Sequence, residues 1–456
     1  MRKKIRYVVL LLLCFLILIC LPNEKKATQE TEGKSPVVHN MNILLNLFGI
    51  KEEKPATIHL EHKTGEERIR VVIKNNGYSS IYHEEIEIED SKGNHWRFCN
   101  AKEEQEKNIC LIGEEENRFI VTTLDRNQTF GGFRGDLYLY AEEDGYVLVN
   151  ELPLEAYLYG VVPGEMPASY PLEALKAQAV CARSYAYDKL LHPRYERYTA
   201  HLDDSTSFQV YGTGAERDST NEAVRITEGQ VLLQGETEVL ETWYYSTSMG
   251  NGREYLLKEN RLEDRGSWQG YLQDLTEEEA FQAVIHTVDE QDLENQEKLY
   301  RWTVECFDKD ICEKLYDKLK QLPSIQGDAL KRFQYINNLE VTKRGQGGVV
   351  EEITIVTEKG SYSVEGESNC RKLLCLESAE IRDQYGTLWE GMELLPSGFF
   401  VIETSTNNEN VIGYKLCGGG FGHGRGMSQN GAKGLALRGY SYEEILMFFY
   451  GEDGDL

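Results

Sequence analysis

Val161-Val-Pro-Gly-Glu-Met-Pro167 is the stretch that decides the fold of this chain, because it fixes one carboxylate between two prolines. Pro163 and Pro167 restrict the backbone on both sides of Glu165, and Gly164 permits another segment to approach closely. The pattern predicts a rigid turn that holds the acid in place. A positioned acid indicates catalysis, so Glu165 is the first candidate for a catalytic residue.

A helix is predicted directly after this turn, over Tyr170-Pro-Leu-Glu-Ala-Leu-Lys-Ala-Gln-Ala-Val-Cys-Ala-Arg-Ser-Tyr-Ala186. Pro171 suits the first helical position. Small and apolar side chains recur at spacings of three and four, which predicts one buried face. These residues are Leu172, Leu175, Ala179, Ala182, Ala186 and Leu190.

Arg183 lies on the same predicted face, so its guanidinium should point into the protein. A buried charge without a partner is strongly unfavourable, and Arg183 therefore needs an anionic partner. Glu165 or a substrate carboxylate would make it a substrate-binding residue. Another acid of this acid-rich chain would make it a structural residue, and the pattern leaves both alternatives open.

Three blocks of this sequence together resemble the SpoIID/LytB domain proteins. They are Asn150-Glu-Leu-Pro-Leu-Glu-Ala-Tyr-Leu-Tyr-Gly-Val-Val-Pro-Gly-Glu-Met-Pro167, Asp204-Ser-Thr-Ser-Phe-Gln-Val-Tyr-Gly212 and Gly422-His-Gly-Arg-Gly-Met-Ser-Gln429. Three blocks in the order of the family are a far more specific signal than one short motif. The resemblance implies a lytic transglycosylase, which cleaves peptidoglycan glycan strands stripped of their stem peptides and leaves 1,6-anhydro-N-acetylmuramic acid ends.

The resemblance also assigns roles to residues. Glu165 corresponds to the catalytic acid and base of the family, while Arg183, His423 and Gln429 are expected to contact the glycan. For His423, packing against the surrounding glycines is an alternative. Tyr271-Leu-Gln273 is the counterpart of a Tyr-Leu-Lys segment of the family, so Tyr271 is a further substrate-binding candidate. Glutamine replaces the lysine there, and one positive contact is therefore missing.

A single carboxylate suits this chemistry. Hydrolytic glycosidases use two acids, one to protonate the leaving oxygen and one to activate water or attack the sugar. In a lytic transglycosylase the C6 hydroxyl of N-acetylmuramic acid is the nucleophile, so one residue can serve as acid and then as base. Glu165 must then be protonated near neutral pH. Its apolar neighbours Val161, Val162 and Met166 are of the kind that raises the pKa of a carboxyl group.

The sequence lacks the motifs of three other kinds of site: a nucleotide-binding loop, a serine hydrolase elbow and a His/Cys zinc site. The glycine-rich segment from Cys417 to Gly431 contains no Gly-x-Gly-x-x-Gly and no Gly-Lys-Ser/Thr, so a nucleotide loop is excluded. Ser428 does not lie in a Gly-x-Ser-x-Gly elbow, which excludes a serine hydrolase of that type. His201 has no cysteine near it in sequence to complete a His/Cys zinc site, and we predict no metal and no cofactor.

The N-terminus predicts a membrane anchor over residues 1–22. Basic residues precede an apolar run from Tyr7 to Leu21, and no small-residue cleavage site follows. The run is shorter than the ~20 residues that usually span a bilayer, a gap that snorkelling side chains can close. The basic flank places the N-terminus in the cytoplasm and the rest outside. The expected location is the cell membrane, single-pass with an extracytoplasmic domain; a cleaved signal peptide and secretion are the alternative.

Composition agrees with an extracytoplasmic globular protein. The net charge of -27 excludes nucleic acid as a partner, because that partner requires a basic surface. Glycan contacts must then come from hydrogen bonds, local cations and aromatic rings. Four tyrosines near the motif are candidates for such contacts or for packing: Tyr157, Tyr159, Tyr185 and Tyr187. The chain has 10 cysteines, whose pairing the sequence leaves open.

The fold class expected is α+β, with a mostly antiparallel β scaffold around one catalytic helix. A linker over 23–58 precedes a β-rich part over 59–149 and a catalytic domain over 150–450. Residues 276–322 form an acidic helical insertion, expected as a solvated helical hairpin or a decoration of the groove. Strands are expected at Arg68–Lys74, Ile86–Glu89, Leu137–Tyr140, Val349–Glu358 and Phe399–Glu403, and a capping box of Ser441 and Glu444 starts the last helix.

Two functions follow from the resemblance. The first is the lytic transglycosylase, thinning septal peptidoglycan during engulfment in sporulation. The second is a non-catalytic, glycan-binding activator of a partner N-acetylmuramoyl-L-alanine amidase. The partners implied are peptidoglycan glycan strands, the cell membrane through the N-terminal helix, a sporulation amidase and other engulfment proteins.

Overall fold

The structure is a computed structural model that describes residues 58–63, 67–104, 108–114, 117–125, 131–250, 278–288, 290, 292–306, 311–322, 330–376, 380–407 and 410–451. All of them belong to one unit of the chain, Thr57–Leu456. The expected anchor over 1–22 and nearly all of the expected linker lie outside the described residues. Among the helices that are described, none is long and apolar enough to cross a membrane.

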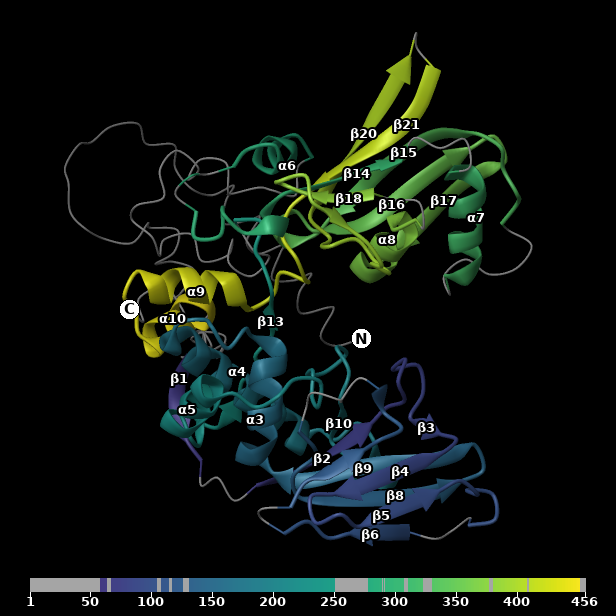
Figure 1. Cartoon of the computed structure of the whole chain (residues 1–456). Helices are drawn as coiled ribbons and strands as arrows, with labels where there is room; N and C mark the ends of the chain where they lie inside the picture. The colour runs from purple at the N-terminus through teal and green to yellow at the C-terminus, as the bar shows by residue number, and fades with distance from the viewer. Residues whose placement is uncertain are drawn as a thin grey trace, which may run out of the picture. The chain divides into compact units, whose positions relative to one another are not determined.

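The N-terminal part is built on a six-stranded sheet of order β10-β2-β9-β8-β6, with β3 paired to β9 (Figure 1). Its strands are β2 Arg68–Ile73, β3 Tyr82–His83, β6 Asn108–Leu111, β8 Asp136–Glu142, β9 Gly145–Pro153 and β10 Leu202–Asp203. Buried and partly exposed residues alternate along β8, as expected for a strand with one face on the core. β9 is buried on both faces, which makes it the central strand.

Two smaller antiparallel sheets accompany it. They are β5-β4-β7, of His95–Phe98, Ile86–Asp90 and Phe119–Val121, and β1-β11-β12, of Ile58–His62, Gln230–Gln234 and Glu238–Val239. The predicted strands at Arg68, Ile86 and Leu137 are therefore present. Cys99, Cys110, Cys370 and Cys375, whose pairing the sequence left open, are free thiols.

Helix α4, Leu172–Leu191, is the centre of the helical part. It packs against β11 and against α3 Leu154–Glu165, α5 Asp218–Ile226, α9 Gln429–Leu437 and α10 Tyr442–Tyr450. The predicted single buried face is too narrow, because every residue from Ala177 to Ala186 is buried. Its many alanines allow neighbouring helices to approach from several sides. Pro171 is the N-cap rather than the first helical residue, and the predicted capping box of α10 is confirmed.

A parallel pair of short strands closes this part of the chain. β13, Tyr244–Tyr245, pairs with β22, Met427–Ser428, in the register Tyr244 to Met427 and Tyr245 to Ser428. The chain therefore leaves at β13 and returns at β22, and residues 246–426 are an insertion between these paired strands. After β22, α9 and α10 pack back on α4.

The insertion has its own sheets and core. Its five-stranded sheet has the order β19-β18-β14-β21-β20, and a three-stranded sheet has the order β15-β16-β17. The strands are β14 Trp302–Cys306, β15 Ile336–Arg344, β16 Val350–Thr357, β17 Gly360–Glu365, β18 Glu380–Asp383, β19 Leu388–Trp389, β20 Phe400–Asn407 and β21 Asn410–Gly418. The helices of the insertion are α6 Glu278–Ile285, α7 Ile311–Gln321 and α8 Glu367–Leu374, and its single 3-10 turns lie at Lys298–Tyr300 and Gln346–Gly348. A further 3-10 turn, Glu196–Tyr198, lies between α4 and β10.

Residues 276–322 are helical as expected at both ends, but they are not a solvated hairpin. Strand β14 lies between α6 and α7 and pairs with β18 and β21 in the middle of the five-stranded sheet. Leu315 and Leu319 of α7 are buried in the core of the insertion together with Trp302. The many acidic residues of the segment misled the prediction, because its apolar side chains are buried in two clusters, one around Leu315 and Leu319 and one around Phe281.

This packing predicts a large stability difference between two neighbouring positions of α7. Leu319→Ala should lower the free energy of unfolding by about 2–5 kcal/mol, because it leaves a cavity in the core. Lys320→Ala, which removes a surface ion pair with Asp317 and an exposed cation–π contact with Tyr316, should cost about 1 kcal/mol. Urea denaturation of both variants checks this. Equal, small effects would mean that α7 is the solvated helix of the sequence-based prediction.

Candidate active site

Glu165 is the last residue of helix α3, with Pro163 inside the final turn. The predicted rigid turn is therefore a helix terminus. Gly164 has the predicted function of permitting close approach: a Cβ atom there would lie 3.2 Å from the carbonyl oxygen of Val210 and 3.3 Å from its Cγ1. The segment that carries Val210 could not come as close to a larger residue.

The carboxyl group of Glu165 is held by two donors. The backbone N–H of Val210 donates to Oε1 over 2.6 Å, and the hydroxyl of Tyr244 donates to the same carboxyl group. Gln209 Nε2 in turn donates to the Tyr244 hydroxyl over 3.0 Å. Glu165 can therefore occupy a defined orientation at the end of its helix.

Burial raises the pKa of Glu165 to about 7, although the hydrogen bonds from Val210 and Tyr244 lower it. Val161, Val162 and Met166 are fully buried beside it, as the sequence predicted. No other carboxylate among the described residues contributes to this shift. The residue as a whole, however, is only partly buried.

Gln429 supports Glu165 from behind. Its Nε2 donates to the backbone carbonyl of Glu165 over 2.9 Å and to Gln178 Oε1 over 3.3 Å. Gln429 is buried, at 8% exposure. Its contacts are those of a residue that positions Glu165, whereas the sequence analysis expected a glycan contact.

His423 lies in a row of aromatic rings. Its ring centroid is 5.4 Å from that of Trp243 and 5.7 Å from that of Tyr245, and Trp243 also meets Tyr185 edge to face at 6.2 Å. We call Tyr185, Trp243, Tyr245 and His423 the aromatic row. Trp243 is 38% exposed, so the row reaches the surface. Trp243 is the residue before Tyr244, whose hydroxyl donates to the carboxyl group of Glu165.

The glycine-rich loop fits closely against this row. A Cβ atom on Gly426 would lie 1.9 Å from the carbonyl oxygen of Trp243, and one on Gly422 would lie 2.7 Å from Cβ of Tyr245. Both glycines also have positive φ angles, +68° and +117°. His423 Nδ1 accepts a hydrogen bond from the N–H of Arg425 over 3.1 Å, which places the proton of the neutral ring on Nε2. His423 therefore packs against the glycine-rich loop and also belongs to the aromatic row.

Arg183 pairs with Glu155 and not with Glu165. Its Nε and Nη2 donate to the two carboxylate oxygens of Glu155 over 2.6 and 2.7 Å. Nη1 and Nη2 also donate to the carbonyl oxygens of Gln230 and Val224. The side chain is 1% exposed. Of the alternatives that the sequence left open, these contacts are those of the structural one. The helical pattern gave the direction of the side chain but not its neighbour.

The remaining candidates are distributed elsewhere. Tyr271 and Gln273 lie outside the described residues. Tyr157 is fully buried and donates to Gln209 Oε1 over 3.2 Å. Tyr159 lies under the guanidinium of Arg134, and Tyr187 donates to Glu67. His201 Nδ1 accepts from the N–H of Arg70, so it joins β2 to the segment before β10.

Four contacts of the site were missed by sequence reasoning: Gln209, Val210, Trp243 and Tyr244. Gln209 and Val210 lie in the block Asp204–Gly212, which was quoted for the resemblance without a role. Trp243 and Tyr244 lie in no quoted block. The run Trp243-Tyr-Tyr245 is unusually aromatic, and this is the signal that could have drawn attention to it.

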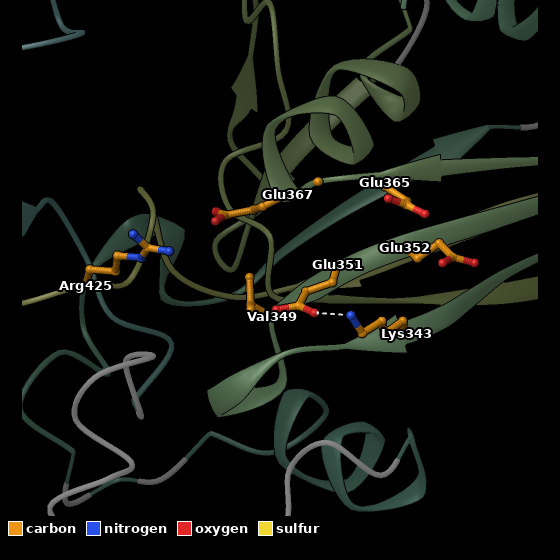
Figure 2. Close-up of a pocket in the computed structure, with 8 residues that line it drawn as sticks. Lys343, Val349, Glu351, Glu352, Glu365, Glu367 and Arg425 are labelled. Carbon is orange, nitrogen blue, oxygen red and sulfur yellow. Dashed lines mark ion pairs between the residues drawn. The ribbon is translucent and has the colours of Figure 1, made fainter. Parts of the chain in front are cut away.

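An acidic hollow of about 380 Å³ opens beside the glycine-rich loop (Figure 2). It is lined by Lys343, Val349, Glu351, Glu352, Glu365, Gly366, Glu367 and Arg425. Figure 2 shows the guanidinium of Arg425 directed toward Glu367, and Lys343 pairs with Glu351 over 3.0 Å. Within the part of the chain that the structure describes, Arg425 makes no ion pair shorter than 4 Å. Glu165 is not part of this hollow.

The fold and the site define an α+β protein that presents one carboxylic acid of raised pKa beside a row of aromatic rings. Residues 142–233 match the family model described as Stage II sporulation protein, SpoIID. Similarity to the SpoIID family is therefore shown for this part of the chain. Residues 248–426 match a second model, a domain of unknown function, DUF8618. Its bounds agree with the insertion between β13 and β22.

Three relatives give the extent of the similarity. The chain is 30% identical over 318 residues to the amidase enhancer of Bacillus subtilis, which covers 64% of this chain and 39% of that protein. It is 35% identical over 116 residues to stage II sporulation protein D of Bacillus subtilis, covering 22% and 34%. It is 26% identical over 317 residues to the protein of that name from Bacillus amyloliquefaciens, covering 66% and 74%. The chain thus spans little more than a third of the two Bacillus subtilis relatives.

Removing the buried acid should change how stability depends on pH. The pKa of Glu165 is about 7 in the folded state, above the ordinary value of 4.5, so the folded chain binds more protons between these values. The free energy of unfolding should therefore fall as pH rises from 5 to 8, by up to about 3 kcal/mol from this residue. Glu165→Gln should lose that part of the dependence. Urea denaturation of both proteins at pH 5 and pH 8 measures it, and identical pH dependence would contradict a raised pKa.

A double-mutant cycle should establish Arg183 as a structural residue. Arg183→Met and Glu155→Leu each leave one buried charge without its partner and should each cost about 3–5 kcal/mol of the free energy of unfolding. The double variant should cost clearly less than the sum of the two. The cycle is measured by urea denaturation. Full additivity, or a stable Arg183→Met protein, would indicate that the two side chains do not depend on each other.

Proposed function

We propose that this protein is a lytic transglycosylase that cleaves peptidoglycan glycan strands stripped of their stem peptides. The observation that carries the proposal is the carboxyl group of Glu165, whose pKa is about 7 and which no second carboxylate of the described residues helps to set. A hydrolytic pair would place its carboxyl groups about 5–9.5 Å apart. One acid that is protonated near neutral pH suits an intramolecular reaction better.

The reaction would proceed on one residue. The protonated carboxyl of Glu165 gives its proton to the glycosidic oxygen as the bond to C1 of N-acetylmuramic acid breaks. The C6 hydroxyl of the same sugar bonds to C1, and the carboxylate takes the proton of that hydroxyl. Glu165 ends protonated as it began, and the product is a 1,6-anhydro sugar with no water consumed. A pKa near the working pH serves both steps, because it balances donating and accepting.

The surroundings of Glu165 match these tasks. The N–H of Val210 and the hydroxyl of Tyr244 stabilise the carboxylate that forms after proton donation. Gln429 fixes the helix end through the carbonyl of Glu165. The aromatic row offers apolar ring faces against which sugar rings can pack, beside the acid. With a net charge of -27, such contacts must carry glycan binding.

The proposed setting is the cell wall of a sporulating cell. The relatives named stage II sporulation protein D and amidase enhancer support this. We further propose the location expected from the N-terminal sequence, with residues 1–22 in the cell membrane and the domain outside, and an amidase as partner that supplies the stripped strands.

A second function is favoured by one of the relatives. The amidase enhancer matches over a larger share of this chain than stage II sporulation protein D of the same organism, 64% against 22%. The alternative is therefore a glycan-binding protein that activates a partner N-acetylmuramoyl-L-alanine amidase. In that role Glu165 would be unnecessary and the aromatic row would bind the strand.

The two functions give different products. The full chain is incubated with amidase-treated peptidoglycan, and the soluble products are analysed by mass spectrometry. Wild type should release fragments with 1,6-anhydro ends, more slowly as the pH rises above about 7, because Glu165 loses its proton. Glu165→Gln should reduce their rate of formation by a factor on the order of 100 or more.

Glu222→Gln, which changes an exposed acid of α5, is the matched control and should retain the wild-type rate. Fragments with ordinary reducing ends would indicate hydrolysis and a second carboxylate. The activator function predicts no fragments, intact glycan binding, and faster release of stem peptides when the amidase is added. That acceleration should survive in Glu165→Gln.

A further inference from the structure

Three side chains with metal-binding atoms meet in the insertion. They are His286, directly after helix α6, Glu403 on β20 and Cys417 on β21, and one ligand atom of each lies within 4.8 Å of the others. His286 Nε2 is 3.0 Å from Glu403 Oε1, and Cys417 Sγ is 3.6 Å from Glu403 Oε2. The insertion itself matches only a domain of unknown function.

The sheet holds two of these groups on one face. Cys417 lies directly opposite Val401 in the antiparallel pair of β20 and β21. Glu403 is two residues beyond Val401, so its side chain emerges on the same face as those of Val401 and Cys417. β21 is an inner strand, paired on its other side with β14. The carboxylate and the thiol therefore stand on a rigid support.

Helix α6 brings the third group. Phe281, Val284 and Ile285 pack in one apolar cluster with Val401 and Cys417, so α6 covers this same face. The N–H of His286 still donates to the carbonyl of Gln282 over 3.3 Å, which continues the last helical turn. The imidazole is thus placed at the helix end, over Glu403.

The distances between the three ligand atoms and the solvent exposure of their side chains both suit a bound metal ion. Ligands at zinc distances of about 2.0–2.3 Å in a tetrahedron lie roughly 3.3–3.8 Å from one another. The separations of 3.0 and 3.6 Å reach different oxygens of Glu403, and all three ligand atoms lie within 4.8 Å of one another, so side-chain rotations can bring them to three corners. Cys417 is buried at 6% exposure, whereas the side chains of His286 and Glu403 are 45% and 42% exposed. The fourth corner therefore faces solvent.

We propose that His286, Glu403 and Cys417 bind one zinc-type transition-metal ion, with water as the fourth ligand. Imidazole and thiolate together favour zinc over magnesium or calcium, which prefer oxygen ligands. Binding releases the thiol proton to solvent, because only the thiolate binds the metal. The ion joins α6 to β20 and β21. The sequence shows no metal-binding motif here, because the three ligands come from separate segments of the chain.

Cobalt titration of the full chain tests the proposal. The purified protein is stripped with a chelator and titrated with Co²⁺, whose thiolate charge-transfer absorption reports bonding to cysteine. Wild type should bind one equivalent with this band, and one equivalent of Zn²⁺ should displace it. Cys417→Ser should lose the band, whereas Cys312→Ser, which changes a thiol beside the carbonyl of Gln334, should retain it.

His286→Ala changes an exposed residue and should keep the fold, but it should weaken cobalt binding at least about tenfold. Zn²⁺ should raise the melting temperature of wild type and Cys312→Ser clearly more than that of His286→Ala. Glu165→Gln should bind cobalt like wild type, so this result is independent of the proposed function. A folded wild type without the band, or a band that persists in Cys417→Ser, would overturn the proposal and leave an ion pair beside a thiol.

Discussion

The parallel pairing of β13 with β22 is the constraint on which the rest of the site depends. Tyr244 lies opposite Met427 and Tyr245 opposite Ser428, although almost the entire insertion separates them in sequence. This pairing fixes Tyr244 at the carboxyl group of Glu165 and sets the glycine-rich loop against Trp243 and Tyr245. It also starts α9, so Gln429 reaches the carbonyl of Glu165. The acid is thus positioned by chain segments from both sides of the insertion.

The carboxyl groups of Glu155, Glu165 and Glu294 lie in sparsely hydrated surroundings, and their partners distinguish them. Glu155 faces Arg183, and this ion pair compensates both charges. Glu294 is 4% exposed, accepts from the N–H of Ser248 and the hydroxyl of Ser428, and has its pKa raised well above the ordinary value. Glu165 also has a raised pKa, yet it remains partly open to solvent. A raised pKa alone therefore does not distinguish a candidate catalytic acid from a buried structural one, and the partial exposure of Glu165 is what separates it from Glu294.

The sequence predicted local secondary structure better than it predicted which distant residues are in contact. The strands at Arg68 and Leu137, the capping box of α10 and the apolar surroundings of Glu165 follow from spacing and composition, which are local properties. The partner of Arg183 and the support from Tyr244 and Gln429 depend on contacts between distant segments, which periodicity does not encode. The insertion was misjudged for a related reason. Its many acidic residues between 276 and 322 suggested a solvated surface, but apolar ones among them, such as Leu315 and Leu319, face the core.

The insertion and the candidate acid are connected through Ser428. Its hydroxyl donates to Glu294 of the insertion over 2.7 Å and also accepts the N–H of Gly431 as the N-cap of α9. Gln429, the next residue, holds the carbonyl of Glu165. A displacement of Glu294 would therefore leave a buried carboxyl without its donors and weaken the cap of the helix that carries Gln429. Because both effects cost free energy, the folded insertion favours the geometry in which Glu165 is held, and the two parts act as one structural unit at this point.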